Sequence, residues 1–335
     1  MVAEILSTHT PELFQKAVRR AAERLRAGEV VALPTETVYG LAANTLDEKA
    51  VAKIFQIKGR PAHNPIIVHV SSNEMAQACV TKWTGLADKF SKAFWPGPLT
   101  LVLPRAEKIP NVVTADGETV GVRWPSHPFM QAVIRECGFP LAAPSANLSN
   151  QISPTNAEHV RAQLGDKISL IVDGGQSQVG IESTVLDLTV SPPRILRPGM
   201  IHAASLAAVA DNIQHPTSNI QHPRLKSPGL LAKHYSPKAK LVILNWADDA
   251  DLKFQISNFK FQIADCRVIA HTHIPGGFNA ENVSVMPHDA EAFARALYAE
   301  LHRCDAAETK LIVVEAPPAS PEWSGIADRL RRAAA

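Results

Sequence analysis

The chain has 335 residues, of which 46% are hydrophobic and 20% are charged, a balance typical of a folded globular protein and unlike that of a disordered chain. Its length predicts about two domains. The net charge is only +2, and basic and acidic residues are nearly equal in number both within positions 1–210 and beyond them. This balance argues against a dedicated nucleic-acid-binding protein, so any cationic site must be local.

The cysteines and the N-terminus bear on the compartment. The four cysteines, Cys79, Cys137, Cys266 and Cys304, are scattered without a C-x-x-C pair, which argues against a zinc ribbon and fits a reducing environment. The N-terminus lacks the basic and apolar regions of a secretory signal. No apolar run approaches the ~18 residues of a membrane span. We therefore expect a cytoplasmic protein.

Residues 1–210 are expected to form helices and strands that alternate irregularly. Thr10, Pro11 and Glu12 mark the start of a helix that Gly28 ends. Further helices are expected over residues 50–57, 73–80, 83–94, 127–137, 154–164 and 203–210, the fifth of these capped by Ser153. Strands are expected over residues 30–33, 66–70, 99–103, 119–123, 141–143, 168–172, 183–188 and 194–196. Several strands follow one another directly, which favours a mixed sheet covered on both faces over a parallel Rossmann sheet.

Residues 211–239 are interpreted as a linker. The segment Asn212-Ile213-Gln214-His215-Pro216 recurs seven residues later as Asn219-Ile220-Gln221-His222-Pro223. Two copies are too few for a solenoid, so a duplication within a linker is favoured over a metal site formed by His215 and His222. A second, smaller α/β domain is expected over residues 240–335, with strands near 241–244, 267–270, 283–286 and 311–314 and helices near 290–303 and 323–332.

Several well-known catalytic and nucleotide-binding motifs are absent from the sequence. It contains no P-loop, no G-x-G-x-x-G after a strand, no G-x-S-x-G around Ser145 and no H-E-x-x-H. His271-Thr272-His273 could hold a metal ion, but in an extended segment both imidazoles would share one face without a third ligand. An ordinary strand end is the favoured interpretation of that segment.

The first candidate site is the loop that follows the helix over residues 50–57. Lys58 and Arg60 flank Gly59 there. Two cations at this position could simply be a solvated helix end, where the helix dipole favours them. The prolines that bound the loop, Pro61 and Pro65, make it a rigid one. This rigidity favours a phosphate clamp, with lysine as a point charge and arginine as a fork.

Other polar groups lie at later strand ends. Ser145 and Asn147 follow small residues that would let a ligand approach the backbone, although an ordinary polar turn is an equal alternative. Arg123 lies between an apolar strand and a Trp-Pro corner, which favours a carboxylate clamp over a surface cation. Ser183, in Glu-Ser-Thr-Val after two glycines, is a weaker candidate of the same kind, and Arg197, in Arg-Pro-Gly, supplies one more cation.

Seven short motifs follow one another along the chain: P-T-E-T-V-Y-G-L at 34–41, K-G-R-P-x-x-N-P at 58–65 with I-V-H-V after it, V-G-V-R-W-P at 120–125, A-P-S-A-N at 143–147, E-S-T-V at 182–185, R-P-G at 197–199 and S-P-G…H-Y-S-P at 227–237. Taken in order, these segments resemble the threonylcarbamoyl-AMP synthase (L-threonylcarbamoyladenylate synthase) family in its two-domain YrdC-like form. The resemblance covers nearly all of residues 10–240, and the C-terminal part matches in position and size more than in motif. Leu230 and Ser236 depart from the family pattern, which has Met and Ala there.

The resemblance implies a fold and an activity. The fold is a three-layer YrdC-like domain with a twisted mixed sheet over residues 1–210, a linker or lid over the active site at 211–239, and a Rossmann-like domain at 240–335. The implied enzyme is a nucleotidyltransferase that converts L-threonine, bicarbonate and ATP into L-threonylcarbamoyladenylate and pyrophosphate. Mg²⁺ would accompany ATP, with no protein ligand assigned to it. The product would pass to the tRNA threonylcarbamoyl-transferase machinery that modifies the adenosine next to the anticodon. Neither stable nucleic-acid binding nor a membrane contact is expected.

The same resemblance implies roles for individual residues. The expected catalytic residues are Lys58 and Arg60. L-Threonine would be bound by Thr35, His69, Arg123, Ala143 and Ser183. ATP would be bound by Lys58, Arg60, Ala62, Thr119, Ser145, Asn147, Ser153, Arg197 and Tyr235, the last reaching in from the linker.

Two alternative functions stay open from the sequence. One is a relative of the same fold that forms a carbamoyl adenylate for another acceptor, as in hydrogenase maturation; those chains carry acylphosphatase and zinc-finger regions, for which this sequence has no motif. The other is a non-catalytic RNA-binding module. The balanced charge and the 6% aromatic content disfavour such a module, because backbone binding and base stacking need cations and aromatic rings.

Overall fold

The computed structural model describes residues 2–215 and 233–335. The chain divides into two compact units, the first made of Met1–Ser149 and Ser153–Leu230 and the second of Asn150–Ile152 and Leu231–Ala335. The second NIQHP copy lies outside the described residues, as do most of the predicted linker and its S-P-G segment. The predicted domain boundaries at residues 210 and 239 stay predictions.

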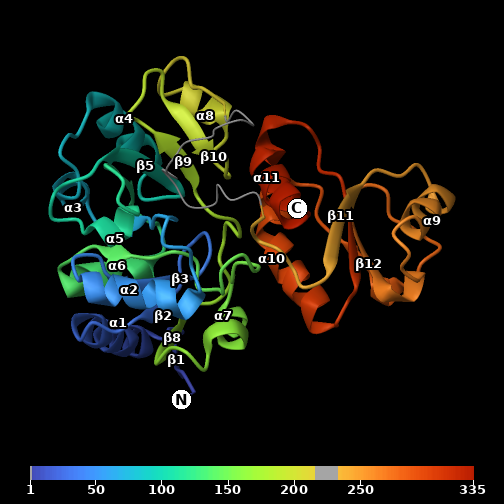
Figure 1. The fold of residues 1–335 in the computed structure, drawn as a ribbon, viewed down its shortest axis with the longest axis horizontal. Helices are drawn as coiled ribbons and strands as arrows, with labels where there is room; N and C mark the ends of the chain where they lie inside the picture. Colours follow the sequence, from blue (N-terminus) through green and yellow to red (C-terminus); the bar gives the residue numbers. More distant parts are fainter. Residues whose placement is uncertain (1, 216–232) are drawn as a thin grey trace. The chain divides into compact units, whose positions relative to one another are not determined.

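The first unit is built on a mixed sheet of ten strands in the order β1-β8-β2-β3-β7-β4-β6-β5-β9-β10 (Figure 1). Parallel pairs, such as β1 with β8, occur beside antiparallel pairs, such as β2 with β3. The strands are β1 (Glu4–Ser7), β2 (Val31–Leu33), β3 (Gly40–Asn44), β4 (Val68–His69), β5 (Leu99–Pro104), β6 (Thr119–Arg123), β7 (Leu141–Ala142), β8 (Leu170–Asp173), β9 (Thr184–Asp187) and β10 (Arg194–Arg197).

Helices cover both faces of this sheet. They are α1 (Pro11–Arg26), α2 (Glu48–Lys58), α3 (Asn73–Ala78), α4 (Gly85–Phe94), α5 (Asn111–Thr114), α6 (Pro128–Cys137), α7 (Ala157–Leu164) and α8 (Ala203–Ala207). Strand β2 shows how the faces separate. Val31 and Leu33 pack in one core with residues of α1 and α6, and Ala32 packs in the other core with residues of α2, α4 and α7. Since alternate strand residues point to opposite faces, the short apolar strands bury both sides of the sheet. The predicted fold class, a mixed sheet between helical layers, is therefore confirmed for this unit.

The helix expected to begin at Pro154 begins later. α7 starts at Ala157, and its N-cap is Asn156, whose side chain accepts a hydrogen bond from the His159 N–H. Ser153 is therefore not the cap, and its hydroxyl donates instead to the carboxylate of Glu182 at 2.6 Å. Either Ser or Asn can cap a helix, so the sequence alone did not decide between the two positions.

The second unit contains a parallel sheet of four strands in the order β11-β14-β12-β13. The strands are β11 (Lys240–Leu244), β12 (Cys266–Ala270), β13 (Val283–Val285) and β14 (Leu311–Glu315), and the helices are α9 (Asp249–Ser257), α10 (Ala290–Ala306) and α11 (Ser324–Ala333). Ile312 and Val313 point to opposite faces of β14 and are both fully buried, as expected for a sheet covered on both sides. The predicted Rossmann-like α/β domain is confirmed.

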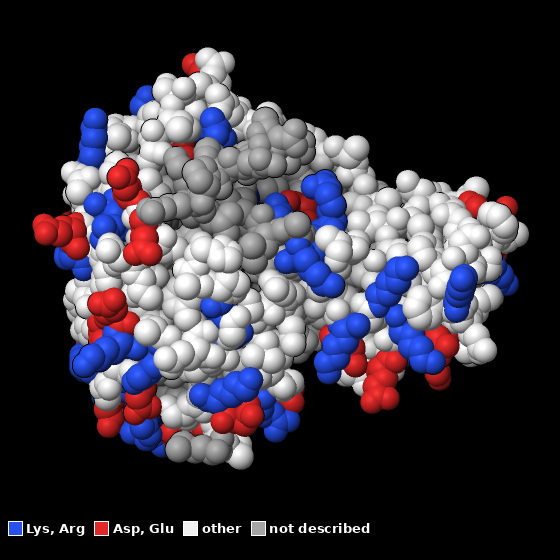
Figure 2. Space-filling model, viewed as in Figure 1, with Lys and Arg blue, Asp and Glu red and all other residues white. Residues whose placement is uncertain are grey.

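The surface agrees with the balanced composition. Figure 2 shows acidic and basic side chains interspersed over the face that it presents. Within residues 2–215 and 233–335, no helix has the length and apolar character needed to cross a membrane.

Candidate active site

A buried turn after β2 forms the first part of the site. Thr35 follows Pro34, and its Oγ1 accepts hydrogen bonds from the backbone N–H groups of Thr37 and Val38. The same hydroxyl lies 2.6 Å from the Val38 carbonyl oxygen and 2.9 Å from Thr37 Oγ1. From the other side, Ser177 Oγ donates to the Thr35 carbonyl. A threonine hydroxyl that binds the following backbone stabilises a tight turn, so this loop is fixed by its own side chains.

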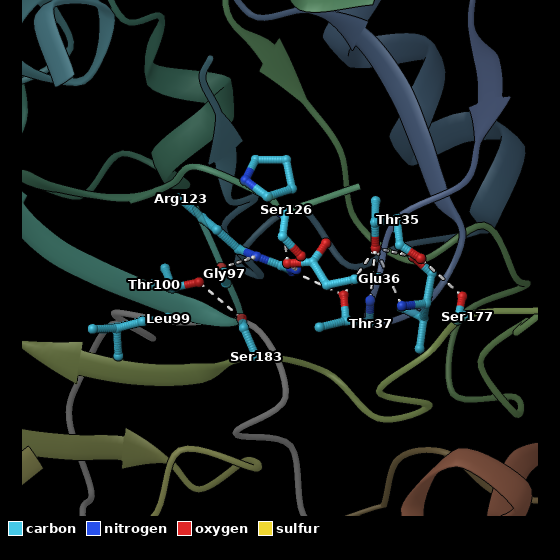
Figure 3. Close-up of polar contacts among 12 residues, drawn as sticks. Thr35, Glu36, Thr37, Gly97, Leu99, Thr100, Arg123, Ser126, Ser177 and Ser183 are labelled. Carbon is cyan, nitrogen blue, oxygen red and sulfur yellow. Dashed lines mark hydrogen bonds and ion pairs between the residues drawn. The ribbon is translucent and has the colours of Figure 1, made fainter. Parts of the chain in front are cut away.

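A buried ion pair lies at the centre of the site. Arg123, the last residue of β6, places Nη2 2.7 Å from Glu36 Oε1, and both side chains are at most 7% exposed. Arg123 also donates from Nη1 to Thr37 Oγ1 and from Nε to the Gly97 carbonyl. Figure 3 shows the guanidinium between the turn of Thr35 to Thr37 and the segment around Gly97 and Thr100. Arg123 is therefore buried and paired, which excludes the surface-cation interpretation.

The buried charges set the protonation states of this cluster. Burial tends to raise the pKa of Glu36, but the Arg123 charge and the Ser126 N–H outweigh it, and the pKa lies below its usual value. The pKa of His69 is lowered to about 3 by burial and by Arg123, against a smaller opposing effect of Glu36. His69 ends β4 and pairs in register with Arg123 of β6. Near neutral pH the cluster therefore holds one cation, one carboxylate and a neutral imidazole whose buried Nδ1 has no hydrogen-bond partner.

Hydroxyl groups from β5 and β9 border the same cluster. Ser183, just before β9, lies with its Oγ 2.8 Å from Thr100 Oγ1 in β5. Arg197, which ends β10, donates from Nη2 to Ser183 Oγ and from Nε to its carbonyl oxygen. Next to Ser183, the Glu182 carboxylate accepts the hydrogen bond of Ser153. Ser153, Ser183 and Arg197, three residues expected in the site, therefore lie close together. Arg197 contacts Ser183 directly, and Ser153 contacts its neighbour Glu182.

Lys58 lies at the last position of α2 and is only 2% exposed. Its Nζ donates to the carbonyl oxygens of Ser145 and Asn147 and lies 3.4 Å from Asn147 Oδ1. These are as many acceptors as an ammonium group has N–H bonds. Burial and the Arg60 charge lower the pKa of Lys58 well below its usual value, while Glu182 acts in the opposite direction. The alternative of a solvated helix end is excluded for Lys58, because the ammonium group is buried and holds the 145–147 loop.

Arg60 stabilises the loop in which it lies. Its Nε donates to the Asn64 carbonyl, and its Nη2 donates to Asn64 Oδ1 at 2.8 Å and to the Pro65 carbonyl at 2.6 Å. Gly59, between the two cations, ends α2 in the left-handed region with φ of 59°, where a residue without a Cβ is favoured. This turn lets Lys58 contact the loop of residues 145–147 and Arg60 contact the loop of residues 60–65.

The remaining expected residues differ in burial and in their distance from the ion pair. Ala143 follows β7 and is buried, with its Cβ against Gly40, whereas Ala62 is exposed in the 60–65 loop. Thr119 begins β6, roughly 13 Å from Arg123 at the usual rise of about 3.3 Å per residue, so no described contact joins it to the ion pair. Tyr235 belongs to the second unit, where it is buried between His234, Tyr298 and Arg329.

Sequence reasoning missed the partners of the expected residues. Glu36 and Thr37 lie within the quoted P-T-E-T motif, and a lone acidic residue beside a buried strand is a signal for a counter-ion. Asn64 and Glu182 also lie within quoted motifs. Thr100 gave no signal, because it lies in an apolar strand and its role depends on the distant Ser183.

The geometry defines a class of protein. Buried cations, an imidazole and hydroxyls lie at strand ends of a mixed α/β sheet and in the adjoining loops, an arrangement suited to binding and aligning anionic substrates rather than to attack by a side chain. These features are those of an α/β enzyme that binds phosphate and carboxylate groups.

Comparison with known families makes the assignment specific. A family model described as "Telomere recombination", for Sua5, YciO and YrdC proteins, matches residues 23–199. A second model, described as "Threonylcarbamoyl-AMP synthase, C-terminal domain", matches residues 201–335. The chain belongs to the threonylcarbamoyl-AMP synthase family, a family of enzymes, and the resemblance drawn from its motifs is confirmed.

Individual relatives match this chain over nearly its full length and nearly all of their own. The threonylcarbamoyl-AMP synthase of Pyrococcus abyssi is 39% identical over 94% of this chain and 93% of its own. That of Bacillus subtilis is 39% identical over 99% of this chain and 96% of its own. Among solved structures, P. abyssi Sua5 complexed with L-threonine matches with a TM-score of 0.90, 36% identity, and coverage of 100% of this chain and 98% of that one.

Proposed function

We propose that this protein forms L-threonylcarbamoyladenylate and pyrophosphate from L-threonine, bicarbonate and ATP. The product would supply threonylcarbamoylation of the adenosine next to the anticodon of tRNA. The family and the threonine complex of a relative support this proposal. The observation in this chain that carries it is the buried pair of Arg123 and Glu36, bordered by the hydroxyls of Thr35 and Thr37 and by His69.

An amino acid suits this pair for electrostatic reasons. An ion pair has no net charge, and a zwitterion also has none, so an amino acid can enter without leaving an uncompensated charge in a buried site. A carboxylate is the usual partner of an arginine fork, and Glu36 Oε2 is buried without a hydrogen-bond partner, as an acceptor for an ammonium group would be. Thr35, His69, Ala143 and Ser183 would complete the threonine site.

The nucleotide would occupy the side of the site held by Lys58 and Arg60. Both are buried cations, and both fix loops that carry other expected ATP contacts, Ser145 and Asn147 on one loop and Ala62 on the other. We propose that they neutralise phosphate charge and also hold these loops in place. Ser153, Arg197 and Thr119 are the further proposed ATP contacts in the first unit.

The proposed reaction needs alignment more than a protein nucleophile. An oxygen of the threonine carbamate attacks the α-phosphorus of ATP, the bond from that phosphorus to the bridging oxygen breaks, and pyrophosphate leaves. Fixed cations stabilise the charge that grows on the leaving group. Within the described residues, no three His, Cys, Asp or Glu side chains are grouped to hold a metal ion. Mg²⁺ would accordingly enter with the triphosphate and neutralise its charge.

The decisive experiment is pyrophosphate release with each substrate omitted in turn. We expect release to require ATP, L-threonine and bicarbonate, to fall when serine replaces threonine, and to stop when EDTA removes Mg²⁺. Mass spectrometry of the quenched reaction should show the threonylcarbamoyl adenylate. Release that does not need threonine would indicate another carbamoyl acceptor, and no release from folded protein would contradict the proposal.

The place of the product in tRNA modification needs a separate test. An acyl adenylate is a mixed anhydride that water hydrolyses, so a transferase must consume it soon after release. We propose that adding tRNA and the threonylcarbamoyl-transferase machinery to the reaction transfers the group to the adenosine beside the anticodon. With the balanced surface charge, we expect this chain to bind tRNA weakly by itself.

A further inference from the structure

The second unit carries a group of polar side chains that the proposed reaction does not use. They lie where β12, β13 and β14 end. His271 and Thr272 follow β12, His288 follows β13, and Glu315 is the last residue of β14. The carboxyl ends of neighbouring parallel strands meet at one edge of a sheet, which is where α/β proteins tend to bind ligands.

Glu315 fixes the loop after β12. Its Oε2 accepts hydrogen bonds from the backbone N–H groups of His271 and Thr272, and its Oε1 accepts those of the His273 backbone and of His273 Nδ1. The imidazoles of His271 and His273 consequently point to different surroundings. His271 is buried, and the His273 side chain is 58% exposed. Both rings nevertheless lie beside the Glu315 carboxylate, with His271 Nε2 3.9 Å from Oε2 and His273 Nδ1 2.8 Å from Oε1.

Three atoms with lone pairs converge beside this loop. His271 Nδ1 and His288 Nδ1 are 3.1 Å apart, and Thr272 Oγ1 lies 2.9 Å from the first and 3.1 Å from the second. In tetrahedral coordination with metal–nitrogen distances of about 2.0–2.1 Å, neighbouring ligand atoms are about 3.3 Å apart. The triangle therefore has nearly the dimensions of one face of a tetrahedral metal site.

The surroundings of His271 hold its ring so that Nδ1 faces His288 Nδ1 and Thr272 Oγ1. Its Nε2 lies 3.3 Å from the Ala316 carbonyl oxygen, which can only accept a hydrogen bond, so this contact favours the tautomer that leaves a lone pair on Nδ1. Metal-ligating histidines usually have such a partner on the second ring nitrogen. The ring also stacks on Trp323 at 5.4 Å and meets Phe293 edge-on at 5.7 Å, so its orientation is fixed by packing.

We propose that His271 Nδ1, His288 Nδ1 and Thr272 Oγ1 form a binding site for one transition-metal cation of the Zn²⁺ type, with water completing its coordination. Imidazole nitrogen suits zinc, and a neutral hydroxyl is a weaker ligand. The proposed site has two histidine ligands and one threonine ligand. It is therefore consistent with the finding that the described part of the chain holds no group of three or more His, Cys, Asp or Glu side chains able to bind a metal ion. The cation would join the loops after β12 and β13. A hydrogen bond between the two rings alone is the alternative.

The test is a calorimetric titration of the full-length, metal-free protein with ZnCl₂. We expect one strong site per chain, and we expect Co²⁺ at the same site to give the visible absorption of four-coordinate cobalt. His288→Ala should weaken Zn²⁺ binding at least about tenfold and remove that absorption, since disturbing only the outer partners of a metal ligand already costs about 10–100-fold in affinity. His288 is exposed, so its substitution should leave the fold intact.

His273→Ala is the matched control. It removes another exposed imidazole two residues from His271 that contacts Glu315 rather than the triangle. We expect this variant to bind Zn²⁺ as the unaltered protein does. Equal loss in both variants would reveal ordinary surface binding and overturn the proposal. Unchanged affinity in His288→Ala, or no binding at 1:1 stoichiometry in the unaltered protein, would leave only the hydrogen bond between the rings.

Discussion

At the scale of single residues, the site consists of charges buried together. Arg123 and Glu36 neutralise each other, Lys58 is surrounded by carbonyl oxygens, and His69 stays uncharged beside the guanidinium. The sequence indicated Lys58 and Arg123, and the family resemblance implied His69, but the pairing of Arg123 with Glu36 joins residues 87 positions apart. No local pattern encodes such a contact, because it depends on the order of the strands.

Glu36→Gln should destabilise the protein. The change leaves the Arg123 charge buried without its counter-ion, and breaking a buried pair in this way costs about 3–5 kcal/mol. We expect the free energy of unfolding, measured in urea, to fall by about 3 kcal/mol. The double variant Glu36→Gln/Arg123→Met removes both charges and should be more stable than Glu36→Gln alone. A double variant that is less stable than the single one would show that the pair is not coupled as inferred.

His69 should make stability depend on pH in the mildly acidic range. Its pKa is about 3 in the folded protein against 6.5 as the ordinary value, so between these values the unfolded chain binds one more proton than the folded one. Stability therefore falls as pH falls below 6.5, by up to about 1.4 kcal/mol per pH unit. His69→Gln should reduce that slope between pH 5 and 6.5. Some slope should persist, because burial also lowers the pKa of His127.

Lys58→Ala should lower turnover far more than it lowers affinity for threonine. Its ammonium group is close to Arg60 and Glu182 and holds the 145–147 loop, on the side of the site that we assign to the nucleotide. Loss of a transition-state contact of this kind typically costs about 100-fold or more in kcat. Steady-state pyrophosphate release and threonine titration measure the two effects. Equal losses in kcat and in threonine affinity would assign Lys58 a general structural role.

At the scale of elements, periodicity located the strongly apolar segments and failed where side chains are small or polar. The strand at Thr119–Arg123 was predicted with the bounds that the structure has. β3, Gly40–Asn44, was missed because its small residues resemble a loop. α9, Asp249–Ser257, was also missed, since it buries Leu252 and Ile256 but exposes Phe254. α9 does carry a local start signal, the N-cap Asp248 whose side chain accepts a hydrogen bond from the Asp251 N–H.

The end of α2 gives a test at this scale. Gly59 has φ of 59°, and an added Cβ would meet no atom within 4 Å, so Gly59→Ala should act through backbone strain alone and cost about 1 kcal/mol. Gly85→Ala is the control. It also faces open space, but it lies at the start of α4 without a positive φ, so it should be neutral or slightly stabilising. Urea unfolding of both variants measures the difference. An equal effect of the two changes would contradict the strain argument.

At the scale of the whole molecule, the two units share no strand within residues 2–215 and 233–335. The ten strands of the first and the four of the second belong to separate sheets, and the core around Val313 contains residues of the second unit alone. The alternation of strands and helices after residue 240 predicted this second sheet. The linker at residues 211–239 was predicted from composition and from the repeated segment rather than from hydrophobic periodicity, and its bounds stay a prediction.

Separate sheets and cores predict two thermal transitions in calorimetry. Val313→Ala and Val31→Ala are a matched pair, because each removes the same two methyl groups from a fully buried strand position, one in each unit. Each should cost about 2 kcal/mol, and each should lower the midpoint of one transition while leaving the other in place. A single transition that both variants shift equally would mean that the units unfold as one cooperative body. In that case Zn²⁺ bound near His271 would stabilise the first unit as well. With two transitions, Zn²⁺ should raise only the midpoint of the second unit, the same midpoint that Val313→Ala lowers.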